Sequence, residues 1–236
     1  MLADLCSRYL GYFCRLFMKV ISTNLGDPKV IKWRGKNVQT GIYKYPVNQG
    51  IYLGETDVKE DAVVDRKYHG GIDKACYLFS ADVYEGWKLR FPKADWSLGM
   101  FGENLTVQGL DERNVYIGDQ YEIGESLVEV SEPREPCFKL GVRFGTQTVL
   151  KQCINSHSSG VYVRVLRNGK VVAGDALKLI KREQNEFSLA RIYWLRYHAA
   201  LSDVPELKRA MELECLASSA KRGLGKRLAF FNGYHT

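Results

Sequence analysis

The sequence lacks the features that mark several large classes of protein. It has six cysteines, but no two are separated by only two residues, so neither a Cys-x-x-Cys motif nor a disulfide framework is indicated. A Gly-x-Gly-x-x-Gly fingerprint for dinucleotides is also missing. The first residues do not have the positive start of a secretory signal. These absences predict a reducing, cytoplasmic setting.

The composition is that of an ordinary globular protein. The 236 residues are 45% hydrophobic and 26% charged, which allows one substantial core and a small appendage. The formal net charge of +7 favours an anionic ligand, although nucleic acid and acidic lipid would be attracted as well. Charge alone does not decide between them. We expect no nucleic-acid partner and no stable insertion into a membrane.

Residues 1–17 form a predicted N-terminal extension. Apolar side chains recur there at helix-like intervals, but the stretch is too short and too polar to span a membrane. Three interpretations stay open: an amphipathic anchor, a packing helix, or vector-derived or upstream sequence before a start at Met18. The strand pattern that begins at Met18 slightly favours the third.

For residues 18–182 the sequence predicts a mainly β barrel with a few peripheral helices. Many short β-rich runs in this stretch are separated by Gly, Asn and Asp. Two runs, residues 115–123 and 171–179, resemble each other. Each places Gly-Asp before an alternating apolar segment, which is typical of a turn leading into a half-buried strand. Residues 80–91 carry apolar side chains at helical spacing ahead of Pro92, which predicts a helix packed on the barrel.

The composition changes at about Glu183, and residues 183–236 predict a small C-terminal domain of three helices. The first is amphipathic and covers residues 188–200. Asp203 is followed three residues later by Glu206, a pattern that resembles a capping box at the start of a second helix.

A third short helix is predicted over residues 216–228, interrupted by Gly223 and Gly225. Four basic residues cluster on it, which is typical of a solvated face; they are Lys221, Arg222, Lys226 and Arg227.

A candidate reactive cysteine follows the predicted strand at residues 126–130. Pro133 and Pro136 end the strand and stiffen the segment after it, because proline lacks a backbone donor and restricts the preceding residue. Cys137 is therefore expected in a rigid, irregular turn. Arg134 would favour its thiolate, as would Lys139, whereas the nearby Glu135 works against them. The alternative is an ordinary buried thiol that packs as a small hydrophobe.

A second candidate stretch surrounds His69, Gly70 and Gly71 with basic residues, including Arg66 and Lys74. Glycine adopts positive φ readily, so successive N–H groups can converge on an anion such as phosphate. The alternative is a tight turn with surface ion pairs.

Three segments resemble motifs of the MOSC domain family, specifically its YiiM-like branch, in order and spacing. They read Asp-Arg-Lys-Tyr-His-Gly-Gly-Ile-Asp-Lys-Ala at 65–75, Phe-Gly-Glu-Asn-Leu-Thr at 101–106 and Glu-Pro-Arg-Glu-Pro-Cys-Phe-Lys-Leu at 132–140. The resemblance extends from about Met18 to the C-terminal helices. It implies a MOSC-type β-barrel followed by a small α-helical domain.

The resemblance implies that a pocket binds molybdenum cofactor, a molybdopterin whose dithiolene chelates the metal. Cys137 would be the catalytic residue and the protein ligand to molybdenum, because a thiolate is a soft ligand. Basic residues match the anionic cofactor, and an amide such as that of Asn104 both donates and accepts hydrogen bonds, as recognition of a pterin edge requires. The expected cofactor-binding residues are Lys44, Arg66, His69, Gly70, Gly71, Lys74, Asn104 and Arg134.

The implied activity is the reduction of N-hydroxylated compounds, such as hydroxylaminopurines or amidoximes. A separate flavin-containing reductase would supply the electrons, which agrees with the missing dinucleotide fingerprint. The basic cluster on the last predicted helix would then be a candidate docking surface for this acidic partner.

Two other functions stay open. Cys137 could relay sulfur as a persulfide, or the pocket could store cofactor without turnover. MOSC domains also occur in cofactor sulfurases beside a pyridoxal-phosphate-dependent domain, for which this chain has no room. A hydrolase with Cys137 as nucleophile and His69 as base is the third hypothesis.

Overall fold

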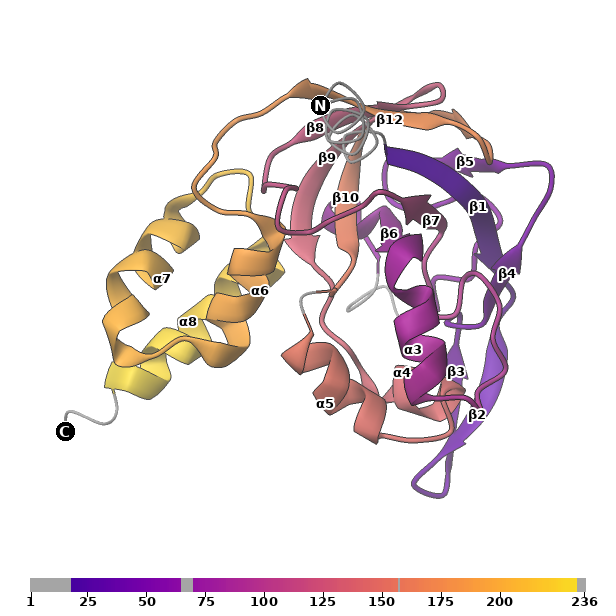
Figure 1. Cartoon of the computed structure of the whole chain (residues 1–236), viewed down its shortest axis with the longest axis horizontal. Helices are drawn as coiled ribbons and strands as arrows, with labels where there is room; N and C mark the ends of the chain where they lie inside the picture. Colours follow the sequence, from indigo (N-terminus) through magenta and orange to yellow (C-terminus); the bar gives the residue numbers. More distant parts are fainter. Residues whose placement is uncertain (1–17, 65–69, 157, 233–236) are drawn as a thin grey trace, which may run out of the picture.

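The computed structural model of the chain describes residues 18–64, 70–156 and 158–232 (Figure 1). Eight strands form one sheet in the order β12-β8-β9-β10-β6-β7-β1-β4, and β12 also pairs with β1, which closes seven of them into a barrel. The prediction of a mainly β barrel is therefore confirmed. The eight strands are β1 (Met18–Gly26), β4 (Lys44–Pro46), β6 (Cys76–Ser80), β7 (Leu105–Gln108), β8 (Gln120–Ile123), β9 (Ser126–Pro133), β10 (Val161–Arg167) and β12 (Ala176–Lys181).

Two further pairs of strands form separate two-stranded sheets. One is a hairpin of β2 (Lys29–Trp33) and β3 (Lys36–Thr40), and the other pairs β5 (Ile51–Leu53) with β11 (Gly169–Val171). The strands predicted from the repeated Gly-Asp pattern are β8 and β12, and they pair with each other antiparallel. Gly118 and Gly174 both have positive φ in the turns that precede them, which explains the glycine at each position.

Short helices cover one end of the barrel (Figure 1). They are the 3-10 helices η1 (Ile72–Lys74) and η2 (Ala81–Val83) and the α-helices α3 (Tyr84–Arg90), α4 (Phe138–Arg143) and α5 (Thr148–Asn155). The helix predicted over residues 80–91 is confirmed as η2 and α3. Its buried Tyr84 and Trp87 pack edge-on against Phe101, so this aromatic stripe belongs to a second hydrophobic core beside the barrel.

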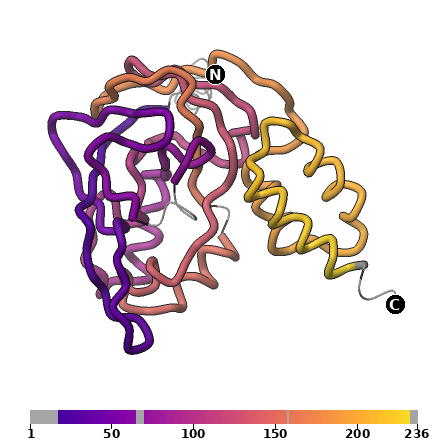
Figure 2. Tube along the Cα trace, turned by 180° about the vertical axis from the view of Figure 1, so that it is seen from behind, coloured from indigo at the N-terminus to yellow at the C-terminus, as the bar shows by residue number. Residues whose placement is uncertain are grey.

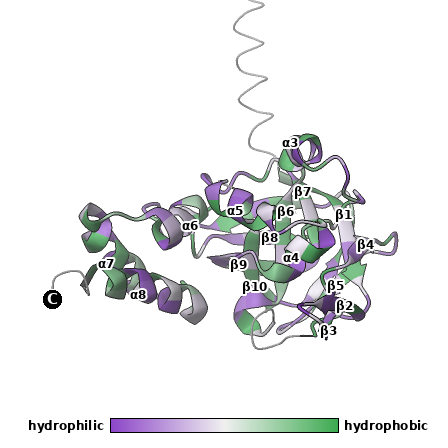
Figure 3. Cartoon of the chain, turned by 90° about the horizontal axis from the view of Figure 1, so that it is seen from below, coloured by the Kyte–Doolittle hydropathy of each residue, from purple (hydrophilic) through white to green (hydrophobic). Residues whose placement is uncertain are grey.

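The C-terminal segment contains α6 (Leu189–His198), a 3-10 turn η3 (Leu201–Asp203), α7 (Val204–Glu212) and α8 (Ser218–Asn232). Figures 1 and 2 show these helices side by side next to the barrel. Hydrophobic and hydrophilic residues alternate along α7 and α8, as in amphipathic helices (Figure 3). Their buried side chains join the same hydrophobic cluster as the inward-facing residues of β9. Whether residues 183–236 form a separate domain stays a prediction.

The starts of two C-terminal helices differ in how they are capped. Ser188 caps α6, since its Oγ accepts a hydrogen bond from the N–H of Arg191 at 3.2 Å. The capping box predicted from Asp203 and Glu206 is wrong for α7, where Asp203 makes no side-chain cap. Both carboxylates pair with the Arg191 guanidinium, and the Asp203 carboxylate also accepts a hydrogen bond from the N–H of Ala200 at 2.7 Å, at the start of η3.

The predicted interruption of the last helix is also wrong, because α8 runs through both glycines without a break. Gly223 has a packing role. A Cβ atom there would lie 2.7 Å from Nε of Arg196, so only glycine lets this arginine cross the helix.

The predicted N-terminal extension at residues 1–17 lies outside the described residues. None of the helices that the structure describes is long and apolar enough to span a membrane.

Candidate functional site

Cys137 lies where the sequence places it, in an irregular segment after β9. The strand ends at Pro133, and Cys137 has extended φ and ψ immediately before α4. Its thiol is half-buried and, unlike an ordinary core cysteine, lines two adjoining cavities. We call these the inner cavity and the outer cavity.

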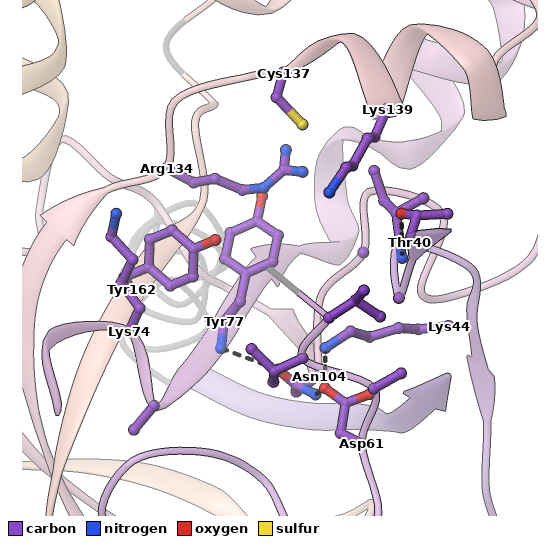
Figure 4. A pocket seen from close by; sticks show the side chains of 17 residues that line it. Thr40, Lys44, Asp61, Lys74, Tyr77, Asn104, Arg134, Cys137, Lys139 and Tyr162 are labelled. Atoms are coloured by element: carbon purple, nitrogen blue, oxygen red, sulfur yellow. Dashed lines mark hydrogen bonds and ion pairs between the residues drawn. The ribbon is translucent and has the colours of Figure 1, made fainter. Parts of the chain in front are cut away.

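The inner cavity has a volume of about 70 Å³ and lies at the end of the barrel that α4 covers. Figure 4 shows the sulfur of Cys137 at one side, pointing into the same space as the guanidinium of Arg134 and the ammonium group of Lys139. The lining residues include Thr40, Lys44, Asp61, Lys74, Tyr77, Asn104, Arg134, Cys137, Lys139 and Tyr162.

Arg134 is the most informative cation of the inner cavity. It is only 6% exposed, and its guanidinium carbon lies 5.0 Å from the centre of the Tyr77 ring. Within the described part of the chain, no carboxylate pairs with this guanidinium. A buried charge without a counter-ion is costly, so its presence beside a cavity indicates an anionic ligand.

Arg143 provides a contrast. It is almost equally buried, at 8% exposed, but its guanidinium donates hydrogen bonds to the carbonyl oxygens of Ile42, Gly99 and Lys44, the last two at 2.8 and 2.9 Å. Burial lowers its pKa. Arg143 therefore ties chain segments together and is not available to a ligand.

The opposite side of the inner cavity is organised by Asp61. Its carboxylate accepts hydrogen bonds from Nζ of Lys44, from Nδ2 of Asn104 at 2.9 Å and from the N–H of Gly26 at 3.0 Å. Oδ1 of Asn104 in turn accepts from the N–H of Tyr77 at 3.3 Å. Lys44 and Asn104 line the cavity, but both also hold Asp61 in place.

Lys74, Cys137, Lys139 and Tyr162 line both cavities. Nζ of Lys74 is 3.3 Å from Oε1 of Glu132, and Lys139 is buried. Burial raises the pKa of Tyr162 to about 12, although the positive charge of Arg134 opposes this shift. The Tyr162 hydroxyl is therefore protonated at neutral pH and has a proton to donate.

The outer cavity, of about 390 Å³, lies between the Cys137 segment and the C-terminal helices. Besides the shared residues it is lined by Glu132, Glu135 and Phe138 and, from α6 and α8, by Arg196, Ser219, Arg222 and Lys226. Glu135, expected from sequence to oppose the thiolate, pairs with Nε of Arg196 at 2.9 Å. Its charge is thereby partly compensated.

The remaining predicted site residues are distributed as follows. Arg66 and His69 lie outside the described residues. Gly70 and Gly71 line neither cavity, and the N–H of Gly71, at φ +93°, donates to the carbonyl of Thr56 at 3.2 Å. An anion cradle at the two glycines stays a prediction.

Sequence reasoning missed several residues that line the inner cavity, among them Asp61, Tyr77 and Tyr162. Asp61 lies in a charged run that is typical of an exposed turn, and the tyrosines alternate with apolar residues as in any barrel strand. None carries a local signal. Among the described residues, no group of three or more His, Cys, Asp or Glu side chains could hold a metal ion. Cys137 is the cysteine that the described lining of the two cavities contains.

Comparison with known proteins decides the family. Residues 65–178 match the MOSC domain model. YflK of Bacillus subtilis is 35% identical over 208 residues, which cover 88% of this chain and 93% of YflK. The chain belongs to the MOSC domain family. The resemblance seen in the sequence is thereby confirmed, and the YiiM-like branch agrees with a solved structure of YiiM from Geobacillus stearothermophilus. That structure has a TM-score of 0.74 and 31% identity, and the match covers 89% of this MOSC chain and 99% of YiiM.

A further relative is a protein named "Reductase" from Gibberella moniliformis. It is 34% identical over 161 residues, which are 67% of this MOSC chain but 28% of that protein. The match therefore covers one part of a longer protein.

Proposed function

We propose that this MOSC protein binds molybdenum cofactor and reduces N-hydroxylated compounds to the corresponding amines, with electrons from a separate flavin-containing reductase. The observation that carries the proposal is the half-buried thiol of Cys137 facing the same cavity as Arg134, a buried cation that pairs with no carboxylate among the residues the structure describes. The match to a protein named "Reductase" supports an oxidoreductase.

The donor set fits the cofactor chemically. Cys137 offers one soft sulfur ligand, and Arg134, Lys74 and Lys139 offer positive charge to an anionic phosphate and dithiolene. The inner cavity of about 70 Å³ holds only part of such a group, and the outer cavity that continues from it at Cys137 supplies further volume. When bound, the cofactor supplies two-electron chemistry with acceptance of an oxygen atom.

The protein's own residues have three tasks in this proposal. Cys137 ligates the metal, and Arg134 with the lysines balances negative charge. Reduction of R–NH–OH to R–NH₂ and water breaks the N–O bond and consumes two electrons and two protons, so a proton donor is needed. The hydroxyl of Tyr162 and the ammonium groups of Lys74 and Lys139 line both cavities and are the candidate donors.

The test is turnover of a hydroxylaminopurine or an amidoxime by molybdenum-loaded protein with a chemical electron donor. Cys137→Ser is expected to lower the rate at least about a hundredfold, the order of loss when a group essential to the reaction is removed. Cys215→Ser, which changes a half-buried cysteine that lines neither cavity, is the matched control and should retain the rate. Full activity of Cys137→Ser would exclude the assigned role.

A further inference from the structure

One wall of the outer cavity carries basic residues and comes from the C-terminal helices. Arg222 and Lys226 are four residues apart on α8, so they lie on the same helix face one turn apart, and both line the cavity. Lys44 and Asn104, by contrast, line only the inner cavity. The residues of α8 and those of the inner cavity would therefore contact different parts of a bound ligand.

The carboxylates that line the outer cavity are paired with residues other than Arg222 and Lys226. Two carboxylates line the outer cavity, Glu132 and Glu135, and both are already engaged: the first by Lys74 and Ser219, the second by Arg196. Among the residues that the structure describes, Arg222 and Lys226 make no ion pair. Both side chains are exposed to solvent. Two adjacent cations that line a cavity and have no ion-pair partner in the described part of the chain can bind a dianion such as a phosphate monoester.

The cavity also offers a surface for a flat ring. Phe138, which lines it beside Cys137, is half-buried and stacks on Trp33 with the ring centroids 4.9 Å apart. The volume of about 390 Å³ is within the range of small-molecule sites. A base near Phe138 and a phosphate near α8 would occupy the two ends of one nucleotide.

Building on the proposed function, we infer that the substrates are N-hydroxylated nucleotides and that Arg222 and Lys226 of α8 bind their phosphate group. The base carrying the N-hydroxyl group lies toward Cys137, and the C-terminal helices select the phosphorylated form. The free base and the nucleoside lack this contact and are poorer substrates.

The first test measures binding without turnover. Calorimetry with adenosine 5′-monophosphate, the amine product of such a substrate, and with adenosine is expected to show at least about tenfold tighter binding of the monophosphate, the effect of one or two charge-assisted hydrogen bonds. The double variant Arg222→Ala/Lys226→Ala should abolish this preference. Lys208→Ala, which removes an exposed cation on α7 that does not line the cavity, should keep it.

The second test uses the molybdenum-loaded protein and a chemical electron donor, so that docking of a protein partner does not contribute. Each single variant is expected to raise KM about tenfold for the N-hydroxylated nucleoside monophosphate, with KM for the nucleoside and kcat unchanged. Molybdenum content should equal that of the wild type. Loss of molybdenum in the variants would assign the two cations to the phosphate of the cofactor and overturn the inference.

The outcomes separate the two proposals. If the N-hydroxylated nucleoside and its monophosphate are reduced with equal KM, the proposed phosphate site is overturned and the proposed reductase function stands. A monophosphate preference in calorimetry, without reduction of any N-hydroxylated compound, overturns the reductase and leaves the phosphate site. A defect of the variants that is seen only with a protein electron donor overturns the phosphate site in favour of partner docking.

Discussion

The residues that line the inner cavity hold one another in place, whereas five of the fourteen residues that line the outer cavity come from helices after the barrel. Asp61 fixes Lys44 and Asn104 on the inner side through hydrogen bonds from three donors. On the outer side, Arg222 and Lys226 have no partner among the described residues. Pre-organised walls suit a group that stays bound, and unpaired cations at an entrance suit a ligand that comes and goes. This difference underlies the assignment of the cofactor to the inner cavity and the adjoining space at Cys137, and of the substrate phosphate to the α8 side of the outer cavity.

The strongest test of this contrast compares two buried arginines. Arg143→Met removes the donors to three carbonyl groups, which should lower the free energy of unfolding by about 3 kcal/mol or more. Arg134→Met removes a charge that lacks a carboxylate partner in the described structure, so the cofactor-free protein should be as stable as the wild type or more stable by about 1 kcal/mol. Urea unfolding of both variants measures this.

The same two variants should rank in the opposite order when cofactor retention is measured. Arg134→Met is expected to lose cofactor on dialysis, while any folded fraction of Arg143→Met retains it. A large loss of stability in cofactor-free Arg134→Met would show that this guanidinium is a structural element, and the argument for an anionic ligand would fail.

A smaller effect on stability is expected where α8 is attached to strand β9 of the barrel. Oγ of Ser219 on α8 lies 2.7 and 2.8 Å from the two carboxylate oxygens of Glu132 on β9. Burial raises the pKa of Glu132, and the ammonium group of Lys74 opposes the shift. Ser219→Ala should lower the free energy of unfolding by about 1.5 kcal/mol, because a buried charged acceptor loses a donor.

A double-mutant cycle tests this attachment. In a Glu132→Gln background, Ser219→Ala should cost clearly less, with a coupling energy of about 1 kcal/mol. Additive effects of the two substitutions in thermal unfolding would mean that α8 is held by its apolar contacts alone.

The smallest effect on stability concerns Glu112, which is connected to the backbone of Arg134 through Gly160. Its carboxylate accepts a hydrogen bond from the N–H of Gly160 at 3.1 Å, and the Gly160 carbonyl accepts from the N–H of Arg134 at 3.3 Å. Burial raises the pKa of Glu112 from 4.5 to about 7. The folded protein therefore binds an extra proton between these values, so the stability contributed by this group falls as the pH rises from about 4.5 to 7.

Glu112→Gln keeps an acceptor for Gly160 and removes the titration. It should be more stable than the wild type at pH 8 by about 1 kcal/mol and show little difference at pH 5, since a neutral amide avoids the cost of a buried charge. Melting temperatures across this range provide the measurement. Parallel stability curves for the two proteins would exclude a raised pKa.

Local signals in the sequence were sufficient for the barrel strands and for Cys137. Pro133 and Pro136 end the strand in which they lie, and Gly-Asp before β8 and β12 forms the turn in which it lies. These effects are local, so the irregular segment at Cys137 and the two strands were predictable. The capping box at Asp203 failed because Arg191, from another helix, competes for both carboxylates. Gly223 was misread for a similar reason, since its role depends on Arg196.

The candidate site shows the same limit. No sequence pattern distinguishes Arg134 from Arg143, because the difference lies in which carbonyl and carboxylate groups the fold brings to each guanidinium. Asp61 was missed because the lysine and amide that it binds come from segments 17 and 43 residues away. Residues that gain their function from long-range partners need the structure.

The central claim is that Cys137 is the protein ligand of a molybdenum cofactor, and elemental analysis tests it most directly. Protein expressed in a host that loads a control molybdoenzyme is compared with Cys137→Ser and Cys215→Ser. The account predicts near-stoichiometric molybdenum in the wild type and in Cys215→Ser, and metal that is absent or lost on dialysis in Cys137→Ser. No molybdenum in the wild type, with sulfane sulfur on Cys137, would contradict it and indicate a sulfur carrier.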